Sequence, residues 1–127
     1  RQNRRVNLIP TDRKARGHAA EQAAVALLRS KNYTIVCTNY SCKQGELDIV
    51  ARDGDELVFV EVRSRADDEH GDALDAIGPR KQQQVARVAQ AYISLESPVF
   101  ETSRFDVVAE TGDTLEHLVD AFRPHGP

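Results

Sequence analysis

The chain has 127 residues, of which 40% are apolar and 29% charged, and its formal net charge is −3. This composition predicts one soluble globular domain, large enough to form a core without disulfides or a structural metal. No apolar run approaches the roughly 20 residues of a membrane span, and no charged-then-apolar leader is present, so we expect no membrane partner and a cytoplasmic location.

Charge is distributed unevenly along the chain. Basic residues dominate residues 1–16, whereas acidic residues concentrate between Asp67 and Asp75. A basic arm on an acidic body can engage phosphate, because the local field matters more than the net charge. The alternative is a basic tail without a partner. We predict a flexible basic arm over residues 1–12 and a single domain over residues 13–123.

The first half of the domain is expected to be a helix followed by three strands. Thr11 or Asp12 is a suitable N-cap for a helix that runs to about Ser30. Residues 33–38 are rich in β-branched side chains and predict a strand. Asp53-Gly54 stands between two apolar runs, which is a strong hairpin signal, so the second and third strands are expected within residues 45–63.

The second half is expected to be helix, strand and helix. Pro79 suits the first turn of a second long helix, whose expected buried side is Val85, Val88, Ala89, Tyr92 and Leu95. Residues 104–109 predict a fourth strand, and apolar residues at helical spacing within 114–122 predict a final helix. A strand that returns through a helix favours a parallel crossover. The fold class is therefore α/β, with a mixed sheet of an antiparallel meander plus one parallel strand, flanked by helices.

Two acidic residues are expected to face each other in the hairpin. A turn centred on Gly54 and Asp55 pairs Asp48 with Glu61. Like charges on paired strands are destabilising, so a cation between them is expected, and carboxylate oxygens suit Mg²⁺. The same register places Glu46 opposite Arg63, which leaves a salt-bridged sheet edge as the alternative.

Glu21 is the third acidic candidate. It shares a stripe of the first helix with Gly17 and with small or apolar residues, so its carboxylate should point towards the body of the protein. Buried acids are rare unless paired or metal-bound. The alternative is a glutamate favoured by the helix dipole. Gly17 would allow another backbone or a substrate to approach closely.

Other polar residues are less specific. Lys81 shares the inward stripe of the second helix, where it either reaches a phosphate or the carboxylates or extends to solvent. Asp106 is either a charged strand residue or a partner of the site. Cys37 and Cys42 should lie on opposite strand faces without a disulfide. No ligand spacing relates the histidines, which we interpret as incidental: His18, His70, His117 and His125.

Five motifs together resemble a nuclease family. They are Gly17–Glu21, Asn39, Gly45–Ala51, Phe59–Arg65 and Arg104–Asp106. This set resembles the PD-(D/E)XK nuclease superfamily, including archaeal Holliday-junction resolvases, and more closely the YraN-like bacterial family of predicted endonucleases. The resemblance extends from about residue 13 to Phe122. It implies a restriction-endonuclease-like αβββαβ core and an endonuclease, dependent on Mg²⁺ or Mn²⁺, that hydrolyses DNA phosphodiester bonds in branched or damaged DNA.

The resemblance also implies residue roles. Asp48 and Glu61 would bind the metal together with the backbone carbonyl of Val62, and Glu21 would assist the metal or a bound water. Arg63 occupies the place of the superfamily's lysine. Arg13, Arg16, Arg65 and Lys81 would hold the nucleic-acid backbone. Resolvase-like relatives act as pairs on symmetric junctions, so a homodimer is a further expectation.

Arg63 is where the chain departs from the superfamily pattern. Arginine can stabilise charge on a phosphate, but its pKa above roughly 12 prevents it from accepting a proton. The attacking water would then have to be activated at the metal. This departure keeps two alternatives open: a catalytically weak or inactive module that binds nucleic acid or a partner, and an interaction protein whose carboxylates form structural ion pairs.

Overall fold

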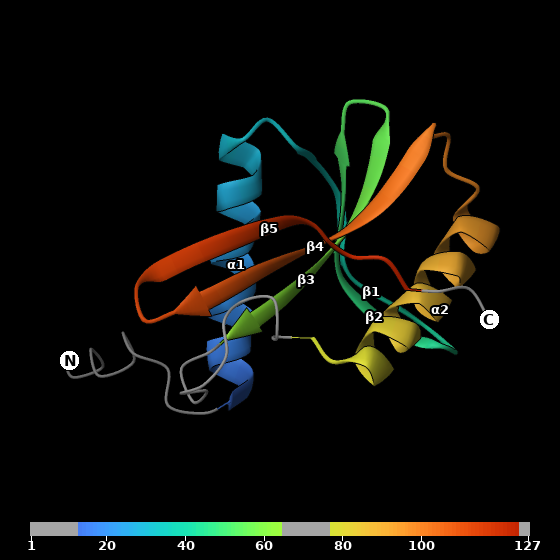
Figure 1. Cartoon of the computed structure of the whole chain (residues 1–127). Coiled ribbons are helices and arrows are strands. Elements are labelled where there is room, and N and C mark those ends of the chain that lie inside the picture. The colour runs from blue at the N-terminus through green and yellow to red at the C-terminus, as the bar shows by residue number, and fades with distance from the viewer. Residues whose placement is uncertain (1–12, 65–76, 125–127) are drawn as a thin grey trace, which may run out of the picture.

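A computed structural model describes residues 13–64 and 77–124, with side chains from Gly17 onward (Figure 1). Its elements are α1 (Arg13–Ser30), β1 (Thr34–Cys42), β2 (Gly45–Asp53), β3 (Glu56–Ser64), α2 (Pro79–Glu96), β4 (Thr102–Thr111) and β5 (Thr114–Phe122). The predicted order of helix, three strands, helix and strand is confirmed. The predicted arm, residues 1–12, lies outside the described residues.

The sheet is mixed, as predicted. Its five strands lie in the order β1-β2-β3-β4-β5, and β3 and β4 form the one parallel pair within the described residues. Helix α2 is the crossover between those two strands. Helices α1 and α2 lie on opposite sides of the sheet (Figure 1). Neither helix has the length and apolar content needed to cross a bilayer within the described residues.

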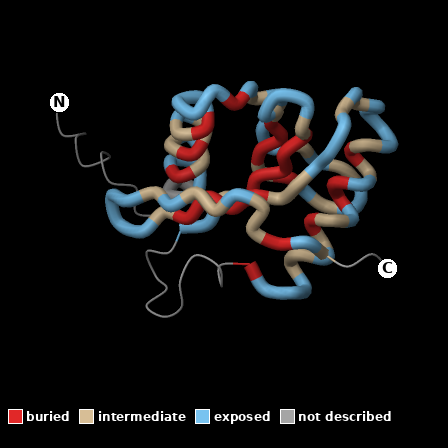
Figure 2. The backbone as a smooth tube through the Cα atoms, turned by 45° about the horizontal axis from the view of Figure 1, so that its top comes forward, coloured by how far each residue is buried: buried red, intermediate tan, exposed pale blue. Residues whose placement is uncertain are grey.

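Each face of the sheet has its own hydrophobic cluster. The cluster on the α1 side includes Ala24, Leu28, Ile49, Val58 and Val60. The cluster on the α2 side includes Leu57, Phe59, Val85, Val88 and Tyr92. Figure 2 shows the buried segments running through the middle strands and along the inner sides of both helices. Because both faces are covered, β3 is a continuous apolar run rather than an alternating one.

The final helix predicted over residues 114–122 is wrong, because this segment is strand β5. Its apolar residues fit helical spacing because the strand contacts both clusters: Leu115 packs on the α1 side, whereas Leu118 and Phe122 pack on the α2 side. A two-residue Gly112-Asp113 loop joins it to β4, with Thr111 paired to Thr114. Glycine followed by aspartate is a hairpin signal, and β5 satisfies the edge backbone groups of β4, which a helix in its place would leave unpaired.

Helix α2 follows the sequence prediction at its start and departs from it at its end. Pro79 occupies the first turn after Gly78 as N-cap. Val85, Val88, Ala89 and Tyr92 are buried as predicted. Leu95 is 65% exposed instead, because it lies in the last turn, which ends at Glu96 before Ser97 turns left-handed with a φ of 49°.

Gly45 begins β2 where the hairpin from β1 passes under α2. Its φ is 138°, and a Cβ at this position would lie 3.1 Å from Gln84 Nε2 and 3.1 Å from Val88 Cγ2. We therefore expect Gly45→Ala to lower the free energy of unfolding by about 1–3 kcal/mol in urea denaturation. Gly54→Ala is the matched control, since Gly54 has a φ of 63° with no described atom within 4 Å of an added Cβ. Equal losses in the two variants would mean that the contact with α2 contributes nothing.

Candidate functional site

The β2–β3 ladder confirms the predicted register and then stops. It runs from Asp53 opposite Glu56 to Ile49 opposite Val60. Beyond Ile49, side chains replace the backbone ladder. The Val62 N–H donates to Asp48 Oδ2 at 2.8 Å, and the Asp48 N–H donates to Glu61 Oε2 at 3.4 Å. Asp48 and Glu61 are therefore neighbours, as the sequence predicted.

The predicted pairing of Glu46 with Arg63 is wrong. The ladder between β2 and β3 ends at Ile49, before it reaches Glu46. Glu46 pairs with Ser41 on β1. Arg63 is exposed. The alternative of a salt-bridged sheet edge built on this pair is thus removed for the described residues.

At the level of Asp48, the alternation of side chains between the two faces of the sheet is interrupted. In β2, Leu47 and Val50 pack on the same side although they are three residues apart. In β1, Cys37 and Tyr40 do the same, on either side of Asn39, whose φ is 55°. Two adjacent strands therefore share one irregularity, and Asp48 and Asn39 lie at its centre.

This irregularity also decides the environment of the cysteines. Cys37 and Cys42 are free thiols, so the prediction of no disulfide is confirmed. Both pack towards the α2-side cluster, so the prediction of opposite faces is wrong. The left-handed residue Asn39 between them shifts the strand alternation by one position.

A cavity of about 280 Å³ opens beside Asp48. Its lining consists of Gly17, His18, Glu21, Asn39, Asp48 and Val62. Glu21 is half-buried, and its Oε1 accepts a hydrogen bond from Asn39 Nδ2 at 2.8 Å. The helix therefore brings Glu21 to the same cavity as Asp48. No described atom lies within 4 Å of a Cβ added at Gly17, so no other backbone approaches it and the space beside it belongs to the cavity.

The environment raises the pKa of both paired carboxyl groups. Glu61 is only 3% exposed, and burial followed by the negative charge of Asp48 raises its pKa to about 8. Burial also raises the pKa of half-buried Asp48, although the hydrogen bond from Val62 opposes this. Lys81 and Arg63 partly offset both shifts by their positive charge. A pair of this kind favours either a proton or a bound cation.

The remaining residues predicted for the site differ in how far the structure describes them. Lys81 is half-buried on α2 and close enough to act on both carboxylates. Arg13 and Arg16 begin α1, but their side chains lie outside the described part. Arg65 also lies outside it. Glu61 adjoins Asp48 without lining the cavity that Glu21 borders.

The available oxygen ligands suit a magnesium site that the substrate completes, rather than a site in which the protein supplies every ligand. The described residues contain no group of three or more His, Cys, Asp or Glu side chains arranged for a metal ion. Mg²⁺ is commonly held by one or two carboxylates together with substrate phosphates, so Asp48 and Glu61 are a sufficient protein contribution. Apart from the long bond from the Asp48 N–H, the Glu61 carboxylate accepts no hydrogen bond from another described residue. A buried carboxylate with so few donors fits a cation ligand.

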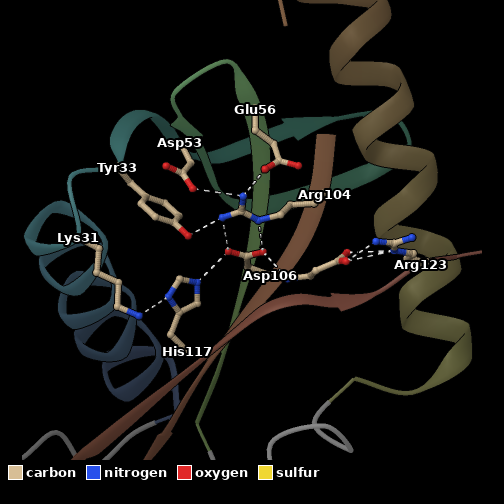
Figure 3. Close-up of polar contacts among 9 residues, drawn as sticks. Lys31, Tyr33, Asp53, Glu56, Arg104, Asp106, His117 and Arg123 are labelled. Carbon is tan, nitrogen blue, oxygen red and sulfur yellow. Dashed lines mark hydrogen bonds and ion pairs between the residues drawn. The ribbon is translucent and has the colours of Figure 1, made fainter. Parts of the chain in front are cut away.

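A second polar cluster lies on the α1 side of the sheet, centred on Asp106 (Figure 3). Asp106 is completely buried and accepts hydrogen bonds from Arg104 Nε at 2.9 Å and from the Asp120 N–H at 2.9 Å. Its Oδ2 lies 2.8 Å from His117 Nε2. Arg104 also bonds Glu56 and the Tyr33 hydroxyl. These contacts make Asp106 part of a buried ion-pair network.

His117 is not incidental, contrary to the sequence interpretation. Its side chain is 2% exposed, and its Nδ1 lies 2.8 Å from Lys31 Nζ. An ammonium group only donates, so Nδ1 accepts and Nε2 carries the proton donated to Asp106. His18 is exposed but lines the cavity beside Asp48. His70 and His125 lie outside the described residues. Only the hairpin signal at Gly112-Asp113, which places residue 117 beside β4, could have indicated the role of His117.

Fold and site together define a class: a mixed α/β domain with paired carboxylates where a strand ladder ends beside a cavity. The chain belongs to the UPF0102 family. A sequence model described as "Uncharacterised protein family UPF0102" matches residues 20–109. The matched segment contains Glu21, Asn39, Asp48, Glu61 and Asp106, whereas β5 lies beyond it.

Relatives from several bacteria share most of the chain. A UPF0102 protein of Syntrophus aciditrophicus is 42% identical over 110 residues, which cover 84% of this chain and 87% of the relative. One from Chloroflexus aurantiacus is 44% identical over 104 residues, covering 81% and 84%. One from Prosthecochloris aestuarii is 39% identical over 127 residues, covering 92% and 98%. The similarity therefore extends over the domain as a whole.

Proposed function

We propose that this protein is a metal-dependent endonuclease that hydrolyses phosphodiester bonds of DNA, with branched or damaged DNA as its substrate class. The observation that carries the proposal is the buried Glu61 beside Asp48, at the point where β2 and β3 cease to pair. Glu21 borders the adjoining cavity from α1. The resemblance to the PD-(D/E)XK superfamily and its YraN-like members supports the same function.

The carboxylates of Asp48 and Glu61, with the carbonyl of Val62, would hold Mg²⁺ or Mn²⁺. The metal would polarise the scissile phosphate and lower the pKa of the attacking water. Glu21, which borders the cavity from α1, would assist the metal or that water. Lys81 and Arg63 would balance the charge of the phosphate, and Arg63 contributes charge without accepting a proton. Contacts of this kind read the backbone rather than the bases, so little sequence preference is expected.

Asp48→Asn and Glu61→Gln test the proposal. Each variant keeps the shape of the side chain but removes its charge, and in Asp48→Asn the amide oxygen can still accept the hydrogen bond from the Val62 N–H. We expect each substitution to abolish Mn²⁺-dependent cleavage of a four-way DNA junction. We also expect the double variant to lose saturable Mn²⁺ binding in calorimetry.

Glu101→Gln is the matched control, because Glu101 is an exposed glutamate whose N–H donates to the Asp55 carbonyl at the β2–β3 turn, the end of the hairpin away from Asp48 and Glu61. It should cleave and bind Mn²⁺ like the wild type. Wild-type cleavage by purified Asp48→Asn or Glu61→Gln would contradict the mechanism. Calorimetry should be repeated with uncleavable DNA present, since substrate phosphates are expected to complete the site.

The second candidate function is binding of nucleic acid or a partner without cleavage. The observation that favours it is Arg63, at the position where the PD-(D/E)XK superfamily that the chain resembles has a lysine able to position water. Introducing that lysine separates the two functions. If Arg63→Lys gains Mn²⁺-dependent cleavage where the wild type shows only DNA binding, the wild-type protein is a binding module on a nuclease scaffold.

A further inference from the structure

Asn39 joins β1 to α1 at the edge of the candidate site. Its side-chain Nδ2 donates to Glu21 Oε1 at 2.8 Å. A carboxylate only accepts hydrogen bonds, so the amide nitrogen rather than the amide oxygen must face Glu21. This is the one hydrogen bond that the Glu21 carboxylate accepts within the described residues.

The backbone at Asn39 presents the amide to the site. Thr38 pairs with Ile49 and Tyr40 with Leu47, so Asn39 stands at the level of Asp48 on the neighbouring strand. Its φ of 55° is left-handed, a conformation that asparagine tolerates better than most residues. An asparagine in this conformation interrupts the strand alternation and still supplies a side-chain hydrogen-bond donor. Glycine would have no such donor.

Asn39 and Glu21 also separate two hollows of the surface. Both residues line the cavity of about 280 Å³ that contains Asp48. Both also line a neighbouring cavity of about 360 Å³, bordered by Gln22, Arg29 and Thr38. The Glu21 carboxylate therefore has space on either side, and the hydrogen bond restricts its position.

We propose that Asn39 is a positioning residue that orients the Glu21 carboxylate for the reaction at Asp48 and Glu61. The inference rests on the proposed function. Without the amide, the Glu21 carboxylate samples both cavities. A smaller fraction of molecules then has the carboxylate in position for the reaction. Residues that support a metal site from behind its ligands typically contribute about 10- to 100-fold in metal affinity or activity.

Asn39→Gly tests the inference because glycine keeps the left-handed backbone and removes only the amide. We expect kcat for Mn²⁺-dependent cleavage of a four-way junction to fall about 10- to 100-fold, with KM for the DNA unchanged. The Mn²⁺ dissociation constant, measured by calorimetry, should rise. Ser41→Gly, an exposed position two residues along β1, is the control for a glycine in this strand.

Two further variants distinguish positioning from a simple tether. Combining Asn39→Gly with Glu21→Gln should cost no more than Glu21→Gln alone, because Asn39 acts through Glu21. Exchanging the roles in Glu21→Gln/Asn39→Asp restores a hydrogen bond with the donor and acceptor reversed. The exchanged pair should regain the thermal stability lost in Asn39→Gly, while its cleavage activity stays impaired.

Three outcomes would overturn the inference. The first is wild-type kcat and Mn²⁺ affinity in Asn39→Gly. The second is losses that multiply when Asn39→Gly is combined with Glu21→Gln, and the third is full activity in Glu21→Gln/Asn39→Asp. In these cases Asp48→Asn remains inactive, so the proposed function stands. If the wild type neither binds Mn²⁺ nor cleaves DNA, the proposed function fails, and this inference fails with it.

Discussion

Asp106→Asn is expected to destabilise the protein by about 3–5 kcal/mol, because it leaves the buried guanidinium of Arg104 without its principal partner. The Arg104 side chain is 9% exposed and that of Asp106 is 0% exposed. Burial alone would raise the pKa of Asp106, but hydrogen bonds from His117 and Arg104 outweigh it and lower the pKa overall. The ionised form is thus the one that the fold requires. An amide would turn an NH₂ group towards at least one of its donors.

Urea and thermal denaturation measure this loss. Domains of this size are stabilised by about 5–15 kcal/mol, so the variant should unfold at far lower urea concentration. Asp120→Asn is the matched control. Asp120 pairs with Arg123, whose side chain is 84% exposed, and asparagine tolerates its φ of 55°. The control should cost at most about 1 kcal/mol. A similar small loss in Asp106→Asn would show that the network contributes little to stability.

The metal-free protein is expected to lose stability as pH rises from about 4.5 to about 8. The pKa of Glu61 is raised from its ordinary value of 4.5 to about 8 in the fold. Between these values the folded state binds a proton that the unfolded chain has released, so the stabilisation is complete below the unfolded pKa and is lost as pH passes the folded one. The pKa of Asp48 is raised as well and acts in the same direction.

Urea denaturation in chelator at a series of pH values tests this expectation. The free energy of unfolding should fall by a few kcal/mol across the range. Glu61→Gln should flatten the profile, whereas Glu101→Gln, at an exposed position beside the β2–β3 turn, should leave it unchanged. Mn²⁺ should restore stability at pH 8, since a cation replaces the proton between the carboxylates. A profile in Glu61→Gln as steep as that of the wild type would assign the pH dependence to other groups.

Local sequence signals were sufficient for the hairpin and for the acidic pair. Asp53-Gly54 sets the turn, and the alternation of strands then places Asp48 near Glu61 without further information. Pro79 likewise marked the start of α2. Glu21 was predicted from its stripe on the helix, since a carboxylate among small and apolar residues has to face something in the protein interior.

Non-local contacts decided what local signals could not. Residues 114–122 have helical spacing, yet they form β5 because the edge of β4 and two hydrophobic clusters accept them as a strand. The predicted pair of Glu46 and Arg63 assumed that the ladder continues, whereas it stops at Ile49. Where strands separate depends on packing against both helices, which no window of sequence contains.

The sequence alone determined the α/β class, the hairpin register, and the identities of Glu21, Asp48 and Glu61 as candidates, because these follow from turn chemistry and short-range periodicity. Only the tertiary structure decided that Asn39 holds Glu21 and that Asp106 gathers Arg104 and His117. Those partners lie 18, 2 and 11 positions apart in the chain. The two more distant contacts form only when helix and strands pack. Packing also buries the pair of Arg104 and Asp106, and the low dielectric of the interior strengthens their interaction.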